Sequence, residues 1–301
     1  VIMFFGNPRL RGTGEHIEMT KEEMKEWLKC SQDIFHFATY FYINAADGMH
    51  PIKLRPYQEK IVQTLIANVP KKNNRIIMQG RQSGKTTIAT LYLTWLALFR
   101  QNKTIAVLAN KESQAIEIMS RIKDAYVNLP LWLQQGINKD VGGWTKGCIG
   151  FDNGTKIFAA ASSSSSIRGK TVDYMLVDEF AHLDANIAED FMMSVFPTQA
   201  SRLDSKLILI STPKGMNHFY DIWMKAVNNQ NSFIPCKVQW NEIEGRDDEW
   251  RARMIKDNGP VFFAQEYACL HGNEEVEIQH PDGAIEKIKI KDLYHNLEYA
   301  I

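Results

Sequence analysis

Short apolar runs alternate with longer helical patterns through the middle of the chain. Five of these runs are rich in β-branched or aliphatic residues and are short enough to be strands buried on both faces. They cover residues 75–79, 104–109, 155–160, 174–178 and 207–212. Strands separated by helices are typical of βα units around a parallel sheet, so the pattern predicts an α/β fold.

Four stretches have a helical pattern: residues 21–41, 84–100, 111–128 and 215–228. The first is amphipathic and precedes the predicted sheet. The longest apolar run, 88–99, lies inside the second and is shorter than the roughly 20 residues that a bilayer needs. Lys85 and Arg100 lie close to its ends. The run therefore predicts a buried helix, and we expect no membrane partner.

Composition and charge set the class of protein. With 301 residues, 45% of them hydrophobic, the chain can bury a proper core. Lys plus Arg equals Asp plus Glu at 35 each, so any contact with DNA must come from a local patch. Cys30, Cys148, Cys236 and Cys269 are far apart and form no zinc-type pair, which favours a reducing compartment. We expect a soluble, cytoplasmic protein.

The stretch "RIIMQGRQSGKTTIAT" combines a strand, a loop ending in Gly-Lys-Thr and an apolar helix, as a phosphate-binding loop requires. Gly84 lets the backbone approach an anion, Lys85 reaches the β- and γ-phosphates, and Thr86 offers a hydroxyl to Mg²⁺. The G-x-x-x-x-G-K-[ST] pattern has its first glycine where this chain has Gln79. The alternative is a chance Gly-Lys-Thr in a loop. The expected nucleotide-binding residues are Gln79, Gly80, Arg81, Gln82, Ser83, Gly84, Lys85, Thr86 and Thr87.

A second motif, "DYMLVDEF", ends a predicted strand with two carboxylates. Ligands of open α/β sheets bind at the carboxyl ends of strands. We expect Asp178 to hold Mg²⁺ through water and Glu179 to polarise the water that attacks the γ-phosphate. An acidic pair after a strand also occurs as a solvated turn or a helix cap. Its order after a phosphate loop favours the catalytic interpretation.

Two weaker motifs complete the set. In "KLILISTPKG", Ser211 and Thr212 end a predicted strand where a side chain can sense the γ-phosphate, although a plain Thr-Pro turn is an equal alternative. In "LRPYQ", Gln58 is a candidate for the adenine edge and Tyr57 for packing nearby.

In this order, "LRPYQ", "QGRQSGKTT", "MLVDEF" and "LISTPKG" resemble the ATPase half of the large terminase subunit of tailed bacteriophages, over roughly residues 50–268. The resemblance implies an ASCE or RecA-like P-loop NTPase sheet flanked by helices. Such terminases deviate at the same P-loop position and carry an arginine inside the loop, matched here by Arg81. It implies that Arg81 neutralises charge on the γ-phosphate in cis; the alternative is a solvent-exposed role. "SSIRGK" makes Arg168 a second candidate.

The same resemblance implies a motor that hydrolyses ATP with Mg²⁺ and translocates double-stranded DNA into a procapsid. Its implied partners are DNA, the portal protein, the small terminase subunit and further copies in a ring, in the cytoplasm of an infected bacterial host. We expect residues 1–50 to be an N-terminal helical lid region, 51–240 the ATPase core and 241–268 the end of the ATPase or a linker subdomain. The family continues with an RNase H-like nuclease, which the 33 residues after Ala268 are too few to form.

Residues 269–301 instead resemble the beginning of an intein of the HINT type. The stretch "CLHGNEEVEIQHPDGAIEKIKIKDLY" has a leading cysteine, a polar turn, a strand, and a hairpin with Pro-Asp-Gly as its turn. In such a segment the Cys269 thiol attacks the Ala268 carbonyl and forms a thioester. No Thr-x-x-His and no terminal His-Asn follow. We therefore expect the N-terminal piece of a split intein, a β-rich fragment with a nuclease-bearing complementary partner.

Charge is consistent with that partner, because the fragment carries seven acidic residues against three lysines and would be steered towards a basic complement.

Two alternatives stay open for the tail: an ordinary buried Cys269 at the start of a truncated domain, and a contiguous intein whose reading frame is cut at Ile301. Two stay open for the function. One is a superfamily 2 helicase, although only about 30 residues separate Trp240 from Cys269, too few for a second RecA-like domain. The other is a splicing precursor without ATPase activity.

Overall fold

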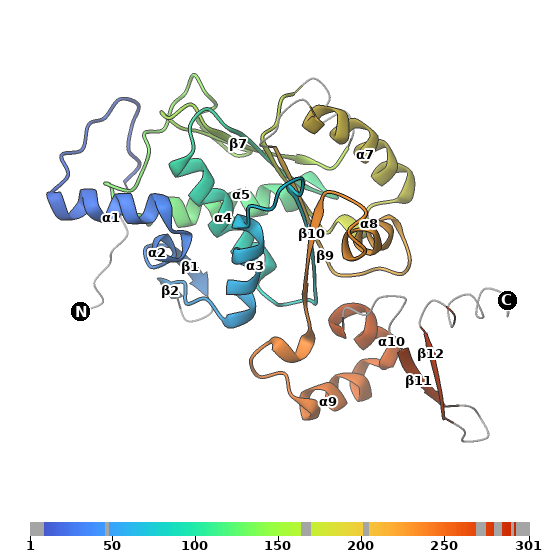
Figure 1. Ribbon diagram of the computed structural model, residues 1–301. Coiled ribbons are helices and arrows are strands. Elements are labelled where there is room, and N and C mark those ends of the chain that lie inside the picture. The colour runs from blue at the N-terminus through green and yellow to red at the C-terminus, as the bar shows by residue number, and fades with distance from the viewer. Residues whose placement is uncertain are drawn as a thin grey trace.

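A single eight-stranded sheet with helices on both faces dominates the computed structural model of the chain (Figure 1). The structure describes residues 9–45, 48–163, 170–200, 205–268, 275–279, 285–289 and 292. The strand order is β10-β3-β9-β8-β4-β7-β6-β5. Pairing is parallel from β10 to β7 and antiparallel from β7 to β5. The strands are β3 (Asn74–Gln79), β4 (Thr104–Ala109), β5 (Trp144–Thr145), β6 (Cys148–Gly150), β7 (Lys156–Ala161), β8 (Tyr174–Asp178), β9 (Lys206–Ser211) and β10 (Phe233–Val238).

The five strands predicted from the apolar runs are the five at the centre of this sheet, each within one residue of its expected bounds. Strand β9 lies between β3 and β8. Its register pairs Ser211 with Met78 of β3, and Ile210 with Asp178 of β8. The carboxyl ends of the three strands that carry the P-loop, the acidic pair and the Ser-Thr motif therefore lie side by side.

Alternate residues of the central strands pack on opposite faces, as the two-residue period of a strand requires. Ile77 packs with the helices of one face, and Ile76 and Met78 pack with those of the other. The first face is covered by α3 (Pro56–Ile66), α4 (Lys85–Phe99) and α5 (Glu112–Val127), and the second by α7 (Ala185–Ala200) and α8 (His218–Val227). None of the helices in the described part of the chain has the length and apolarity needed to span a bilayer.

The helix predicted over residues 21–41 is wrong in one respect, because two helices form there: α1 (Lys21–Gln32) and α2 (Ile34–Ala38). Asp33 between them has an extended backbone, and its side chain accepts a hydrogen bond from Phe35 N–H at 2.8 Å. Aspartate competes in this way for backbone donors and starts a new helix. For the same reason α8 begins at His218 and not at residue 215, since the Asn217 side chain caps it.

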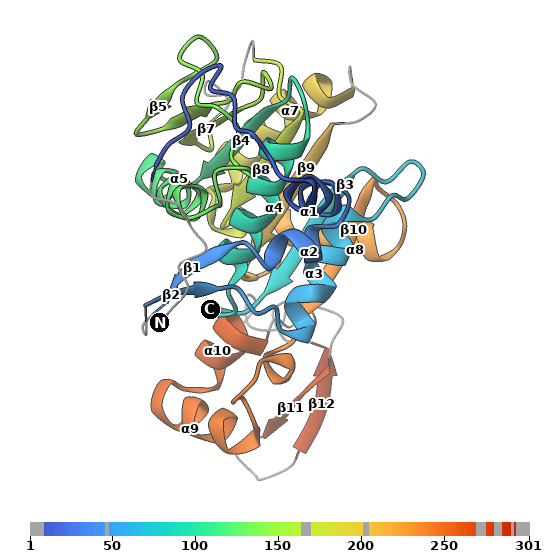
Figure 2. The same cartoon turned by 90° about the vertical axis from the view of Figure 1, so that its left-hand side faces the viewer.

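After β10 the chain forms a separate group of elements at one end of the sheet in both views (Figures 1 and 2). It contains the 3₁₀ turn η2 (Trp240–Glu242), α9 (Asp248–Asn258), α10 (Pro260–Phe263) and a π-helical turn, η3 (Ala264–Ala268). Two antiparallel strands follow, β11 (Glu275–Gln279) and β12 (Ile285–Lys289). A second hairpin, β1 (Tyr42–Ala45) and β2 (Gly48–Pro51), precedes α3. Arg168, Cys269 and the Pro-Asp-Gly turn lie outside the described residues.

Candidate active site

The loop between β3 and α4 has the shape of an anion cradle. Gly84, immediately before α4, has φ 74°, the left-handed conformation that glycine adopts without a steric cost. The Ser83 hydroxyl donates to the Gly80 carbonyl at 2.6 Å and closes the loop on itself. The first N–H groups of α4, from Lys85 onward, have no partner within the helix and point towards the loop, which is the arrangement that binds phosphate.

The "LRPYQ" segment meets this loop in a cavity of about 730 Å³. Gln58 approaches Gly84 so closely that a Cβ on Gly84 would lie 2.7 Å from Gln58 Nε2. The other end of the amide is fixed, because Gln58 Oε1 accepts a hydrogen bond from Arg55 N–H at 3.1 Å. The cavity is lined by His50, Arg55, Tyr57, Gln58, Gln82, Gly84 and Thr87, among others. Size and lining are those of a small-molecule site beside the phosphate loop.

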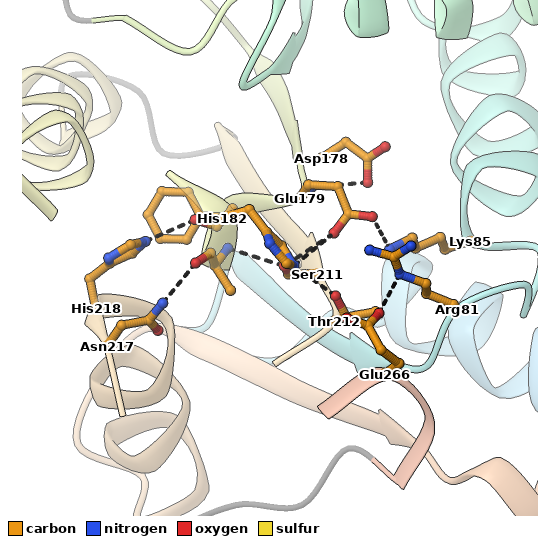
Figure 3. Close-up of polar contacts among 12 residues, drawn as sticks. Arg81, Lys85, Asp178, Glu179, His182, Ser211, Thr212, Asn217, His218 and Glu266 are labelled. Atoms are coloured by element: carbon orange, nitrogen blue, oxygen red, sulfur yellow. Dashed lines mark hydrogen bonds and ion pairs between the residues drawn. The ribbon is translucent and has the colours of Figure 1, made fainter. Parts of the chain in front are cut away.

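The two strongest motifs are in direct contact, since Lys85 Nζ donates to Glu179 Oε1 (Figure 3). The Lys85 side chain is 11% exposed and that of Glu179 is 29% exposed, so the pair lies in a recess that solvent reaches only in part. Asp178 precedes Glu179 at the end of β8. Burial raises the pKa of Asp178 to about 6, while Lys85 opposes that rise.

The oxygen donors beside Lys85 suit Mg²⁺. Asp178 and Thr86 offer a carboxylate and a hydroxyl, and Mg²⁺ in phosphate sites is held by one or two carboxylates plus phosphate oxygens. No cluster of three or more His, Cys, Asp or Glu that would hold a metal by itself occurs within the described ranges. The donor set thus fits a metal that arrives with a nucleotide, and a cation would favour the ionised form of Asp178.

Glu179 has a strained backbone, with φ 53° and ψ 40°. A non-glycine residue in this region costs about 1–3 kcal/mol and persists only where tertiary contacts enforce it. The turn that follows, η1 (Phe180–His182), is held by such contacts. Ala181 N–H donates to Ser211 Oγ at 3.1 Å, and Asn217 Nδ2 donates to the Ala181 carbonyl at 2.7 Å. The catalytic candidate is therefore aimed by β9 and by the start of α8.

The Ser-Thr motif at the end of β9 contacts this turn. The Ser211 hydroxyl donates to Glu179 Oε2 at 3.5 Å, and Thr212 Oγ1 lies 2.9 Å from His182 Nε2. His182 was not among the residues predicted from the sequence, although its position three residues after Glu179 in "DEFAH" was a signal. Burial lowers the pKa of His182, and the nearby Glu179 carboxylate opposes this.

Arg81 has a partner that local sequence patterns could not reveal. Its Nε forms an ion pair with Glu266 of η3, and its N–H donates to the Glu266 carbonyl at 2.9 Å. Arg246 Nη2 donates to the Arg81 carbonyl at 2.8 Å, while its guanidinium stacks 4.8 Å from the ring of Trp250. The Arg81 side chain is 58% exposed. The phosphate loop is thus in contact with the elements that follow the sheet.

Two positions of the loop serve packing. Gln79 is fully buried, and within the described part of the chain neither polar atom of its amide has a hydrogen-bond partner. Its side chain is part of the interior and not of the open site, which differs from its expected place among the nucleotide-binding side chains. Gly80 lies against the η3 backbone, since a Cβ there would be 2.9 Å from the Tyr267 carbonyl oxygen. Any larger residue would force the loop away from η3.

Comparison with known proteins assigns the chain to a family. A curated relative, the large terminase subunit of Thermus phage G20c, is 23% identical over an alignment of 185 residues that covers 57% of this chain and 37% of the relative. The crystal structure of the HK97 bacteriophage large terminase superposes with a TM-score of 0.66 at 18% identity, over 83% of this chain and 56% of that one. The large terminase of a thermophilic bacteriophage in complex with ADP gives 0.53 at 14% identity, over 74% and 55%.

The two solved structures share the fold of this chain. The chain spans between about a third and just over half of the length of these relatives. The family model described as "Terminase large subunit, T4likevirus-type, N-terminal" matches residues 76–280, which is more than half of the sequence. The matched region begins within β3 and includes the P-loop, the acidic pair and the Ser-Thr motif. The chain belongs to the T4likevirus-type terminase large subunit family, of which it carries the N-terminal region.

Proposed function

We propose that this chain is the ATP-hydrolysing motor portion of a viral DNA-packaging terminase. The observation that carries the proposal is the contact between Lys85 and Glu179, which brings a phosphate-binding lysine and a catalytic carboxylate together at the ends of β3 and β8. The ADP complex of a relative with the same fold supports nucleotide binding. The superfamily 2 helicase alternative loses its support, because the family model that matches is a terminase model.

Each element has a role in hydrolysis. The first N–H groups of α4 and Lys85 bind the β- and γ-phosphates, and Gln58 and Tyr57 face the base. Asp178 and Thr86 would hold Mg²⁺, which supplies charge neutralisation at the phosphates when bound. Glu179 accepts a proton from the attacking water. Lys85 would transfer its contact from Glu179 to phosphate oxygens, which frees the carboxylate for this task.

Arg81 would have to exchange Glu266 for the γ-phosphate in order to act in cis, and its largely exposed side chain has room to swing between them. Arg168 remains a second candidate for a phosphate or neighbouring-subunit contact. Beyond the site, we propose double-stranded DNA, the portal protein, the small terminase subunit and further copies of the chain in a ring as partners. The proposed parts are residues 1–50 as an N-terminal helical lid region, 51–240 as the ATPase core and 241–268 as the end of the ATPase or a linker subdomain. We propose that the chain acts in the cytoplasm of an infected bacterium.

ATP turnover by the full chain tests the enzymatic part. We expect Lys85→Ala and Glu179→Gln to abolish Mg²⁺-dependent phosphate release. Glu117→Gln is a matched control, since Glu117 forms an exposed pair with Arg121 on α5. Lys29→Ala, on α1, is the control for the lysine. If the wild type hydrolyses ATP and both site variants retain that activity, the catalytic assignment is refuted. If the wild type does not hydrolyse ATP, the result favours a dormant splicing precursor.

For residues 269–301 we propose the N-terminal fragment of a split intein. The antiparallel pairing of β11 with β12, from Glu275 with Lys289 to Gln279 with Ile285, supports the hairpin that this resemblance implies. The Cys269 thiol would attack the Ala268 carbonyl, so that the peptide C–N bond breaks, a thioester forms and the amine takes up the proton. A complementary fragment with the remaining intein and the nuclease half would accept the acyl group.

Mixing the full chain with a candidate complementary fragment tests the splicing part. We expect a larger ligated product that is absent with Cys269→Ala and present with Cys148→Ala, a control at a cysteine in β6. A product formed equally by Cys269→Ala, or no product from any fragment with intein motifs, would count against the proposal. Slower association at high salt would support charge steering.

A further inference from the structure

The turn after β8 ends in a histidine to which the proposed mechanism gives no task. His182 is the last residue of η1, and its Nε2 lies 2.9 Å from Thr212 Oγ1 and 3.7 Å from Glu179 Oε2 (Figure 3). A single ring nitrogen thus faces oxygen atoms of two motifs that come from different strands. The His182 side chain is 23% exposed, so solvent competes only weakly for these contacts.

The backbone of this turn makes the orientation of the Glu179 carboxylate dependent on contacts with neighbouring side chains. Glu179 is in a left-handed conformation that local preference disfavours. His182 N–H donates to the Glu179 carbonyl at 2.9 Å and closes the turn. The backbone hydrogen bonds fix where the Glu179 side chain starts, but not how its carboxylate rotates. Side chains that lie beside Oε2 and can restrain this rotation are Ser211 at 3.5 Å and His182 at 3.7 Å.

The imidazole is suited to a neutral role. Burial lowers the pKa of His182, with Glu179 opposing the shift and Lys214 adding to it. A neutral imidazole carries one N–H, so Nε2 is either a donor or an acceptor. Its short contact with Thr212 fixes the ring plane in both cases. The fixed ring edge then limits the rotation of the Glu179 carboxylate, without placing a full positive charge beside the group that must accept a proton.

Resting on the ATPase function proposed above, we propose that His182 is a positioning residue that fixes the Glu179 carboxylate for the attacking water and connects it to Thr212 at the end of β9. His182 acts through Glu179 and touches no substrate atom. Its loss should therefore slow the chemical step and leave nucleotide binding intact. Because the same ring contacts Thr212, removal of either partner of that contact should have the same consequence.

Steady-state ATP hydrolysis by the full chain tests the inference. We expect His182→Ala to lower kcat by about 10- to 100-fold, as for a misplaced catalytic group, with KM changed by less than about twofold. Thr212→Val should cause a similar loss, and the double variant should be no slower than the slower single one, since both act on one contact. His182→Gln, whose amide nitrogen reaches the place of Nε2, should restore most of kcat, whereas the shorter His182→Asn should not.

A matched control is available on α2. His36 Nε2 lies 2.6 Å from Glu26 Oε2, a histidine–carboxylate pair outside the site, and His36→Gln should leave kcat unchanged. Affinity for ADP, measured by calorimetry, shows whether each His182 variant is folded. If the wild type turns over ATP and His182→Ala has the same kcat, the inference fails while the proposed function stands. If the wild type has no turnover, both fail. If His182→Ala does not fold, equal kcat for His182→Gln and His182→Asn overturns the inference.

Discussion

Gly84→Ala is the most informative change in the phosphate loop, because the structure separates two costs at this position. The first is conformational: Gly84 has φ 74°, where an alanine costs about 1–2 kcal/mol. For a chain of 301 residues that loss corresponds to a fall of roughly 2–3 °C in Tm. The second is steric, since the new Cβ would lie 2.7 Å from Gln58 Nε2. The amide is the far end of a flexible side chain, so it would move aside rather than unfold the loop.

Displacement of the Gln58 amide removes its proposed hydrogen bond to the adenine of the nucleotide, which is worth about 0.5–1.5 kcal/mol net. The Kd for ADP should then rise about 2- to 10-fold. Gly14→Ala is the control, because Gly14 has φ 66° and a methyl group added there would meet nothing within 4 Å. It should lower Tm by a similar amount and leave the Kd unchanged. In calorimetric titrations, Gln58→Ala should weaken binding as Gly84→Ala does, and the double variant should add little.

The result that would refute this reasoning is a Gly84→Ala variant with the Tm of Gly14→Ala and the ADP affinity of the wild type. Full additivity of the Gly84→Ala and Gln58→Ala losses would also refute it. In that case the methyl group would act on the phosphates directly and not through the amide.

Three further predictions test the interior and the loop contacts. Arg81→Ala should lower the unfolding free energy by about 1–3 kcal/mol, because it leaves the 7% exposed Glu266 carboxylate without this cation. Glu266→Gln should lower it by less than about 1 kcal/mol, because the 58% exposed Arg81 side chain can be hydrated. Equal losses for the two variants in urea unfolding would contradict this. Gln79→Met should raise the unfolding free energy by about 1–3 kcal/mol, because the buried amide has no hydrogen-bond partner in the described part of the chain, and a loss of stability would contradict it. Burial lowers the pKa of Lys206 to about 7, so above pH 7 the unfolded chain binds more protons at this amine than the folded chain does. The unfolding free energy of the wild type relative to Lys206→Met should therefore rise between pH 7 and pH 8, by at most about 1.4 kcal/mol, and a constant difference would contradict the assignment.

The sequence alone predicted the parts of the site that depend on local patterns. A buried strand is a short apolar run, and the end of that run marks where a ligand-facing side chain begins. Asp178 and Ser211 were found in this way, each at the end of a strand, and Lys85 was found from the Gly-Lys-Thr pattern that precedes an apolar helix. Parallel strands place such ends on one edge of the sheet, so their convergence followed from the α/β prediction.

Only the tertiary structure decided which of these ends are neighbours and what lies opposite them. Strand order places β9 between β3 and β8, and this brings Thr212 to His182. The fold after β10 brings Glu266 to Arg81. Neither contact can be inferred from the local sequence pattern, because strand order and the docking of distant elements depend on packing across the whole core. The sequence therefore determined which chemical groups the site contains and at which strand ends they lie. The packing of the sheet determined which side chains contact those groups and orient them.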